Sequence, residues 1–313
     1  MKRAFVFPGQ GSQFVGMGKE AYDSSPEARA VFEEVNEALG ENLTKLIFEG
    51  PAENLTLTQN TQPALMAVSV ALMKIIEKQS GKKIQDLCSY VAGHSLGEYS
   101  ALCAAGAISI ADTARLLRIR GNAMAEAVPA GQGGMAALIG VDFEKAQEVA
   151  KSVSDVGSCQ AANDNGGGQV VISGSMAAID KAVATASQLG VKRAVKLPVS
   201  APFHSELMAP AAKIMQEALA KVVVNKPVVP LIANVTADEV TDPQKIRDLL
   251  VEQVTGMVRW RESVIQLKAK NVSKIVEIGA GKVLAGLVKR IEGDIETVSL
   301  QNPTDIEAFL ATL

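Results

Sequence analysis

The chain has 313 residues, of which 48% are hydrophobic, 21% charged and 4% aromatic, and its formal net charge is −3. This is the composition of a globular protein with one large domain, or a large domain and a small one. It excludes a global basic field that would attract nucleic acid or a membrane surface, so we expect neither as a partner.

The first residues form a short apolar strand, and no stretch approaches the ~20 apolar residues of a transmembrane helix. Cys88, Cys103 and Cys159 are odd in number, lie among apolar or small residues and lack the spacing of a metal site. We therefore expect a reduced, cytoplasmic protein with no metal and no other cofactor.

The first part of the chain alternates strand-like and helix-like segments. The apolar runs at 4–7 and 87–93 are typical of buried strands, and helical spacing favours helices at 63–78, 96–106 and 112–128. This alternation predicts an α/β fold with a parallel sheet.

The pattern changes after a glycine-rich segment at 129–134. Shorter strands and helices alternate from there to about 202, which predicts an inserted ferredoxin-like α+β subdomain over 129–202. The run at 163–168 is interpreted as a turn before a strand. Longer helices and the strand at 274–279 resume after 203, so the flanking parts, 1–128 and 203–313, are predicted to form one discontinuous domain.

The strongest local motif is Gly93-His94-Ser95-Leu96-Gly97, a G-x-S-x-G between an apolar strand and a helix rich in small residues. A nucleophile elbow requires this context, because the glycines permit a sharp turn that exposes the serine hydroxyl. The helix that follows directs free N–H groups to the same place, so the N–H of Leu96 is a candidate oxyanion donor. The alternative is a tight turn with an idle serine.

A nucleophilic serine needs a base, and the chain has only two histidines. His94 adjoins Ser95, and neighbouring side chains at a sharp turn diverge, so we expect a structural role for it. His204 follows two prolines at a loop-to-helix junction and is the candidate base. Asp238 or Asp242 could orient its ring, although each is also typical of a turn or cap residue, and a backbone carbonyl could do so instead.

Arg120 falls on the apolar face of its predicted helix, where an uncompensated charge costs several kcal/mol. It could form a structural ion pair, for instance with Glu98. It could alternatively bind the carboxylate of a substrate in bidentate fashion.

Together these motifs resemble the malonyl-CoA:acyl carrier protein transacylases along essentially the whole chain. FVFPGQGSQ, TQPA, GHSLGEYSA, RGNAM, NGGGQVVISG, the loop ending in His204 and QVTGMVRW occur in the order of that family. The resemblance implies an α/β-hydrolase-like core with a ferredoxin-like insertion. It also implies that malonyl passes from malonyl-CoA to acyl carrier protein, for fatty acid synthesis, through an ester on Ser95.

The resemblance assigns further roles. It makes Ser95 and His204 catalytic, with the backbone carbonyl of Gln253 orienting the histidine and the N–H groups of Gln10 and Leu96 forming the oxyanion hole. The substrate-binding residues that it implies are Arg120, Gln62, Met124, Phe203, Asn163 and Asn165. The expected partners are acyl carrier protein and malonyl-CoA, and we expect a monomer.

The sequence leaves two rival functions open. The same residues could serve a serine hydrolase, such as a thioesterase, or the chain could be a silent module that only binds carrier protein. The basic clusters Lys192-Arg193-Lys196 and Lys268-Lys270-Lys274 are candidate docking sites for an acidic carrier protein, and each could equally be an ordinary solvated face.

Overall fold

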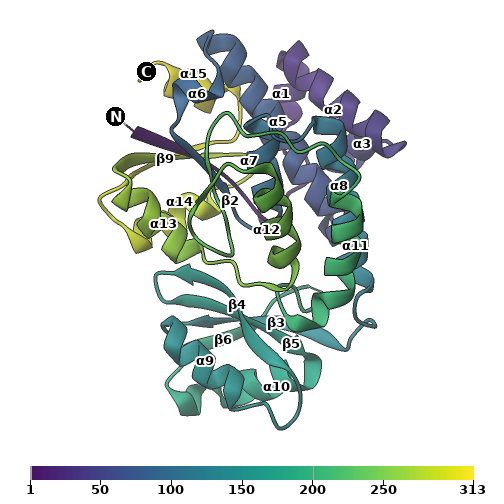
Figure 1. Ribbon diagram of the computed structural model, residues 1–313, viewed down its shortest axis with the longest axis vertical. Coiled ribbons are helices and arrows are strands. Elements are labelled where there is room, and N and C mark those ends of the chain that lie inside the picture. Colours follow the sequence, from purple (N-terminus) through teal and green to yellow (C-terminus); the bar gives the residue numbers. More distant parts are fainter. Residues whose placement is uncertain (1, 200) are drawn as a thin grey trace.

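Two β-sheets of different character organise the chain (Figure 1). The computed structural model describes residues 2–199 and 201–313. A six-stranded sheet collects strands from both ends of the chain, and a four-stranded sheet is formed entirely by the middle.

The six-stranded sheet has the strand order β10-β9-β1-β2-β7-β8. All its neighbours pair in parallel except β7 and β8, so the predicted parallel sheet is confirmed. Its strands are β1 (Lys2–Phe7), β2 (Tyr90–Gly93), β7 (Leu231–Ile232), β8 (Glu239–Val240), β9 (Val272–Ile278) and β10 (Glu296–Leu300). Helices flank this sheet (Figure 1), and the buried run of β1 is apolar as expected for a central parallel strand. The buried run of β9 is apolar except for Lys274 and Glu277.

The helices of this larger part differ widely in length. They are α1 (Lys19–Ser24), α2 (Pro26–Leu39), α3 (Leu43–Glu49), α4 (Ala52–Thr56), α5 (Thr58–Ser80), α6 (Ile84–Leu87), α7 (Leu96–Ala104), α8 (Ile110–Glu126), the 3₁₀ turn Glu206–Met208, α11 (Ala209–Leu219), α12 (Pro243–Thr255), α13 (Trp260–Ala269), α14 (Val283–Ile291) and α15 (Pro303–Leu310). In the part of the chain that the structure describes, no helix is long and apolar enough to span a bilayer.

Helix α5 begins at Thr58, five residues before the predicted start at Pro63. A proline inside a helix leaves the carbonyl four residues earlier without its N–H partner. Here that carbonyl belongs to Gln59, and it accepts a 2.7 Å hydrogen bond from Nη1 of Arg118 on α8. A Cβ at Gly121 would lie 2.4 Å from the Cα of Gln59, so the close approach of α8 requires glycine there.

The four-stranded sheet is antiparallel, with the order β4-β5-β3-β6. Its elements follow the strand–helix–strand–strand–helix–strand order of a ferredoxin-like unit. They are β3 (Gly133–Ile139), α9 (Phe143–Lys151), β4 (Cys159–Gly166), β5 (Gln169–Ser175), α10 (Met176–Thr185), the 3₁₀ turn Ala186–Leu189 and β6 (Arg193–Lys196). The domain boundaries at 128/129 and 202/203 stay a prediction.

The interpretation of 163–168 as a turn is wrong for its first four residues, because β4 continues to Gly166 and only Gly167 and Gly168 make the turn. Polar side chains do not normally favour a buried strand. Those of Asp164 and Asn165 are accommodated because each has a partner outside the small sheet.

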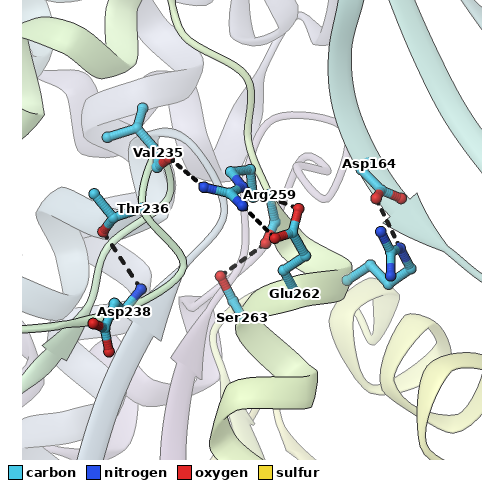
Figure 2. A network of polar contacts seen from close by, with 8 residues as sticks. Asp164, Val235, Thr236, Asp238, Arg259, Glu262 and Ser263 are labelled. Atoms are coloured by element: carbon cyan, nitrogen blue, oxygen red, sulfur yellow. Dashed lines mark hydrogen bonds and ion pairs between the residues drawn. The ribbon is translucent and has the colours of Figure 1, made fainter. Parts of the chain in front are cut away.

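Strand β4 also joins the small sheet to the larger part. The N–H of Asp164 donates to the carbonyl of Val258, and the N–H of Val258 donates to the carbonyl of Ala162. The carboxylate of Asp164, labelled in Figure 2, pairs with Nε of Arg261 at 2.8 Å. This attachment brings β4 against the segment that follows α12, beside the candidate site.

Candidate active site

Ser95 lies on a sharp turn between β2 and α7, in a backbone conformation (φ 54°) that non-glycine residues rarely adopt. A Cβ at Gly93 would lie 1.9 Å from backbone atoms of Gly97, and a Cβ at Gly97 would lie 2.2 Å from the carbonyl oxygen of Phe7. Both glycines of the motif are therefore required for the turn to close against β1. The result is the geometry of a nucleophile elbow.

Two side chains hold this strained turn in place. The N–H of Ser95 donates to Oδ1 of Asn234 at 2.8 Å, and the carbonyl of Ser95 accepts from Nε2 of Gln253 at 3.0 Å. Nδ2 of Asn234 also donates to the carbonyl of Gly93 at 2.6 Å. These hydrogen bonds offset part of the conformational cost of the turn.

His204 presents Nε2 to the serine, 2.8 Å from Oγ of Ser95. Its Nδ1 lies 2.9 Å from the carbonyl of Gln253 and 3.1 Å from the carbonyl of Gly256. Because both partners are acceptors, Nδ1 must carry the proton, and Nε2 of the neutral ring is then a free acceptor for the serine hydroxyl. Burial and the charge of Arg120 lower the pKa of His204 to about 3, which keeps the ring neutral.

The two aspartates considered as orienting residues lie elsewhere. Asp242 caps the N-terminus of α12 by accepting from the N–H of Lys245, and the exposed Asp238 bonds Gln266. Backbone carbonyls therefore orient His204, which selects one of the alternatives that the sequence left open.

Arg120 is buried, with 1% of its surface exposed. Its Nη1 donates to Oε1 of Gln62 at 2.7 Å, and its Nη2 donates to Oε1 of Gln253 at 2.8 Å and to Oγ of Ser95 at 3.0 Å. Within residues 2–199 and 201–313 it forms no salt bridge, and its Nε has no hydrogen-bond partner. A buried cation held only by neutral oxygens is suited to bind an anion that enters the site.

Arg120 and Glu98, considered above as an ion pair, do not contact each other directly, since Gln253 lies between them. Oε2 of Glu98 accepts from Nε2 of Gln253 at 2.8 Å and from the N–H of Asn234 at 3.1 Å. Burial raises the pKa of Glu98 to about 7, and the charge of Arg120 opposes this rise.

Ser95 lines a cavity of about 100 Å³ between the larger part and the small sheet. The predicted site residues that line it are Gln10, Gln62, Ser95, Leu96, Arg120, Met124, Asn163, Phe203 and His204. The small sheet and the segment after it add the apolar side chains of Met135, Leu197 and Val199. The cavity thus has a polar end at Ser95 and an apolar wall, as is common in small-molecule sites.

Asn165 is the predicted binding residue that does not line this cavity. Its Oδ1 is 2.9 Å from Nε2 of His94, so its amide is used within the protein. His94 also packs against Trp260, with ring centroids 5.9 Å apart. These contacts fit the structural role expected for His94 and replace the substrate role expected for Asn165.

The two predicted oxyanion donors line the cavity with Ser95. Within the described residues, neither the N–H of Gln10 nor that of Leu96 donates a hydrogen bond, and Oε1 of Gln10 accepts from Oγ1 of Thr58 at 2.8 Å. Both N–H groups are therefore free to bind an oxyanion, as the predicted role requires.

Sequence reasoning missed Asn234 and Gly256. Asn234 follows the apolar residues of β7, at the carboxyl end of a parallel strand, where functional side chains of open α/β sheets collect. Its position after an apolar run could have identified Asn234 as a candidate site residue from the sequence. Gly256 acts through its carbonyl, which leaves no trace in side-chain chemistry.

The two basic clusters differ in the structure. Lys268 pairs with Glu292 and Asp294, Lys270 pairs with Glu239, and Lys274 is buried and pairs with Glu296, so this cluster is neutralised. In the other cluster Lys196 pairs with Asp180, whereas Lys192 and Arg193 are exposed and form no salt bridge among the described residues. The cluster with Lys192 and Arg193 is therefore the better candidate for docking.

The comparison with protein families decides the class of this site. Residues 4–299 match the acyl transferase domain family. The chain belongs to that family. This acyltransferase is 48% identical over 313 residues to the malonyl CoA-acyl carrier protein transacylase of Bacillus subtilis, covering 100% of the chain and 97% of the relative. It is 44% identical over 307 residues to that of Escherichia coli K12, covering 98% of each chain.

Solved structures agree with this assignment. The acyl-carrier-protein-S-malonyltransferase of Bartonella henselae superposes with a TM-score of 0.97 at 56% identity, covering 100% of this acyltransferase and 99% of that chain. A malonyl-transacylase in complex with its type II PKS acyl-carrier protein superposes with a TM-score of 0.96 at 38% identity, covering 100% of both chains. The predicted α/β fold with a parallel-sheet core and the predicted enzyme class, an acyltransferase, are confirmed.

Proposed function

We propose that this acyltransferase moves a malonyl group from malonyl-CoA to the phosphopantetheine thiol of acyl carrier protein, for fatty acid synthesis, through an ester on Ser95. The observation that carries the proposal is the placement of Oγ of Ser95 between Nε2 of His204 at 2.8 Å and Nη2 of Arg120 at 3.0 Å. The nucleophile, its base and a cation for the malonyl carboxylate thus meet at one atom.

In the first half-reaction the Ser95 oxygen attacks the thioester carbonyl carbon while its proton moves to Nε2 of His204. The N–H groups of Gln10 and Leu96 bind the oxyanion of the tetrahedral intermediate. The carbon–sulfur bond then breaks, and His204 gives the proton to the sulfur of coenzyme A, leaving malonyl-Ser95.

The second half-reaction is the reverse with a different thiol. His204 takes the proton of the phosphopantetheine thiol, the sulfur attacks the ester carbonyl, and the proton returns to the oxygen of Ser95 as the ester breaks. The two carbonyls that accept from Nδ1 of His204 keep the ring in one tautomer throughout. We further propose that no bound cofactor takes part, since the side chains and backbone groups of this chain supply each step. The enzyme is also proposed to be a cytoplasmic monomer.

Intact-protein mass spectrometry tests this proposal. Incubation with malonyl-CoA should add one malonyl group, and holo acyl carrier protein should remove it and gain the same mass. Ser95→Ala should show no addition. Ser100→Ala is a matched control, because Ser100 lies on the same helix, α7, and its hydroxyl has no partner among the described residues. Release of free malonate without any thiol acceptor would instead indicate a hydrolase.

A further inference from the structure

A buried carboxylate lies behind the site, and the mechanism above does not use it. Glu98 is on the first turn of α7, only 1% exposed, three residues after the nucleophile. A buried carboxylate is costly unless hydrogen bonds and a positive charge compensate it. Among the described residues, Glu98 accepts two hydrogen bonds, from Nε2 of Gln253 and from the N–H of Asn234.

The positive charge reaches Glu98 through one side-chain amide. Nε2 of Gln253 donates to Glu98 at 2.8 Å, and Oε1 of the same amide accepts from Nη2 of Arg120 at 2.8 Å. Glu98 and Arg120 therefore form an ion pair bridged by Gln253, and the cavity-facing side of the guanidinium is left to a ligand.

Few other charges act on Glu98. Among the described residues, the charged and titratable groups that influence it are Arg120 from α8 and Tyr99 from α7 itself. Gln253 from α12 and Asn234 after β7 contribute neutral groups. One buried arginine is therefore the compensating charge for this carboxylate.

A bound malonyl group changes this balance, because it brings a second carboxylate to the same arginine. Two carboxylates that share one site raise each other's affinity for protons. The malonyl carboxylate contacts the guanidinium directly, whereas Glu98 contacts it through an amide. Glu98 is therefore the carboxylate that takes up a proton. Burial already raises the pKa of Glu98 to about 7, which makes its proton uptake accessible near neutral pH.

We propose that Glu98 is a specificity-determining residue whose carboxylate competes with the malonyl carboxylate for Arg120, so that malonyl loading of Ser95 is accompanied by proton uptake from solvent at Glu98. This inference rests on the proposed function. An acetyl group has no carboxylate, so its loading leaves Glu98 as it was. The preference for malonyl over acetyl is then highest when Glu98 is protonated and falls as pH rises.

The test is the ratio of kcat/KM for malonyl-CoA to kcat/KM for acetyl-CoA, measured between about pH 6 and pH 9. Titration of His204, of the nucleophile and of the coenzyme A moiety cancels in this ratio. In the wild-type enzyme the ratio should fall by about tenfold, which corresponds to a coupling of one pKa unit between the two carboxylates. Glu98→Gln, which keeps an acceptor oxygen but not the charge, should hold the ratio flat at its high value.

Glu277→Gln is the matched control. Glu277 is the second buried carboxylate whose pKa burial raises to about 7, and it caps α14 through the N–H groups of Leu284 and Ala285, away from the cavity lining. This variant should retain the wild-type fall. A fall that persists in Glu98→Gln, or a flat ratio in the wild type, overturns the proposal.

A measurement on the wild-type enzyme keeps the proposal testable if Glu98→Gln does not fold. Loading with malonyl-CoA in weak buffer containing a pH indicator should consume about half a proton per malonyl group near pH 7.5, and loading with acetyl-CoA should consume none. Mass spectrometry on the same samples counts the acyl groups. Malonylation without proton uptake refutes this inference alone, whereas no malonylation refutes the proposed function.

Discussion

Nη2 of Arg120 donates a 3.0 Å hydrogen bond to Oγ of Ser95, so the cation expected to hold the acyl group touches the nucleophile itself. Oγ of Ser95 accepts this hydrogen bond from Arg120. The hydroxyl hydrogen of Ser95 is therefore directed to Nε2 of His204. The hydrogen bond from Arg120 therefore favours the rotamer of the Ser95 hydroxyl whose hydrogen points to His204.

Replacement of Arg120 by alanine should lower the rate of Ser95 malonylation by about 10²-fold, because charge-assisted hydrogen bonds contribute ~1.5–3 kcal/mol. Acetylation should fall much less, so the variant should favour acetyl relative to the wild type. Rates of mass addition from the two thioesters measure this. Arg115→Ala is the control, since Arg115 is an exposed residue of the same helix and pairs with Asp112. An unchanged malonyl preference in Arg120→Ala would contradict the assignment.

Burial of His204 should make the free energy of unfolding depend on pH. Its pKa in the folded protein is lowered to about 3, below the ordinary value of 6.5, so between these values the unfolded chain binds a proton that the folded protein does not. The free energy of unfolding must therefore fall as pH decreases from about 6.5 toward 3. Urea unfolding at several pH values should show a weaker fall in His204→Gln. Parallel curves for the two proteins would mean that the folded ring titrates normally.

The base should also remain active in acid. Since the ring of His204 stays neutral well below pH 6.5, kcat/KM for acyl loading should keep its value down to about pH 5 and fall only below it, as His204 becomes protonated. Single-turnover acylation of Ser95 across this range is the measurement. Loss of activity with a midpoint near 6.5 would show that His204 is more hydrated than its burial indicates.

Asn234 should prove necessary for the elbow. Asn234→Ala removes the acceptor of the Ser95 N–H and leaves that partly buried donor without its partner, at a cost of about 1–3 kcal/mol in the free energy of unfolding. The same loss should lower the rate of acylation with either thioester, because Ser95 is less well held. Asn54→Ala, at an exposed position, should change neither quantity. Normal acylation in Asn234→Ala would show that the glycines alone fix the turn.

The exposed basic pair should contribute to docking of acyl carrier protein. Charge reversal at Lys192 and Arg193 should raise KM for an acidic carrier protein several-fold and leave KM for malonyl-CoA unchanged. Lys268→Glu is the matched control, because Lys268 is already neutralised by Glu292 and Asp294. Equal effects on both substrates would exclude docking at Lys192 and Arg193.

Much of this architecture could be predicted because its signals are local. The apolar run at 4–7 marked β1, and the glycines around Ser95 marked the turn between strand and helix. The run at 87–93 marked β2, although the strand covers only Tyr90–Gly93 and Leu87 ends helix α6. The early start of α5 could not be predicted, since it depends on Arg118 from another helix bonding the carbonyl that Pro63 leaves free. The prediction of a turn at the polar end of β4 was wrong for the same reason, because Arg261, the partner of Asp164, is distant in sequence.

The site residues were likewise predictable where the signal was local and not where it depended on distant segments. Composition identified His204, since only two histidines exist, and the apolar face of α8 identified Arg120. The bridge through Gln253 depends on three segments that meet only in the folded chain, so the sequence indicated an ion pair with Glu98 only as one alternative and did not indicate the bridge. Interactions between distant segments thus account for the errors at both levels.

The order of the site residues along the chain has a consequence for synthesis on the ribosome. Ser95 and Arg120 emerge before the small sheet, His204 emerges after it, and the carbonyls of Gln253 and Gly256 that orient the histidine emerge later still. A nascent chain therefore carries a nucleophile with no oriented base until most of its length has been made. The Ser95–His204 pair can therefore form only when most of the chain has been synthesised.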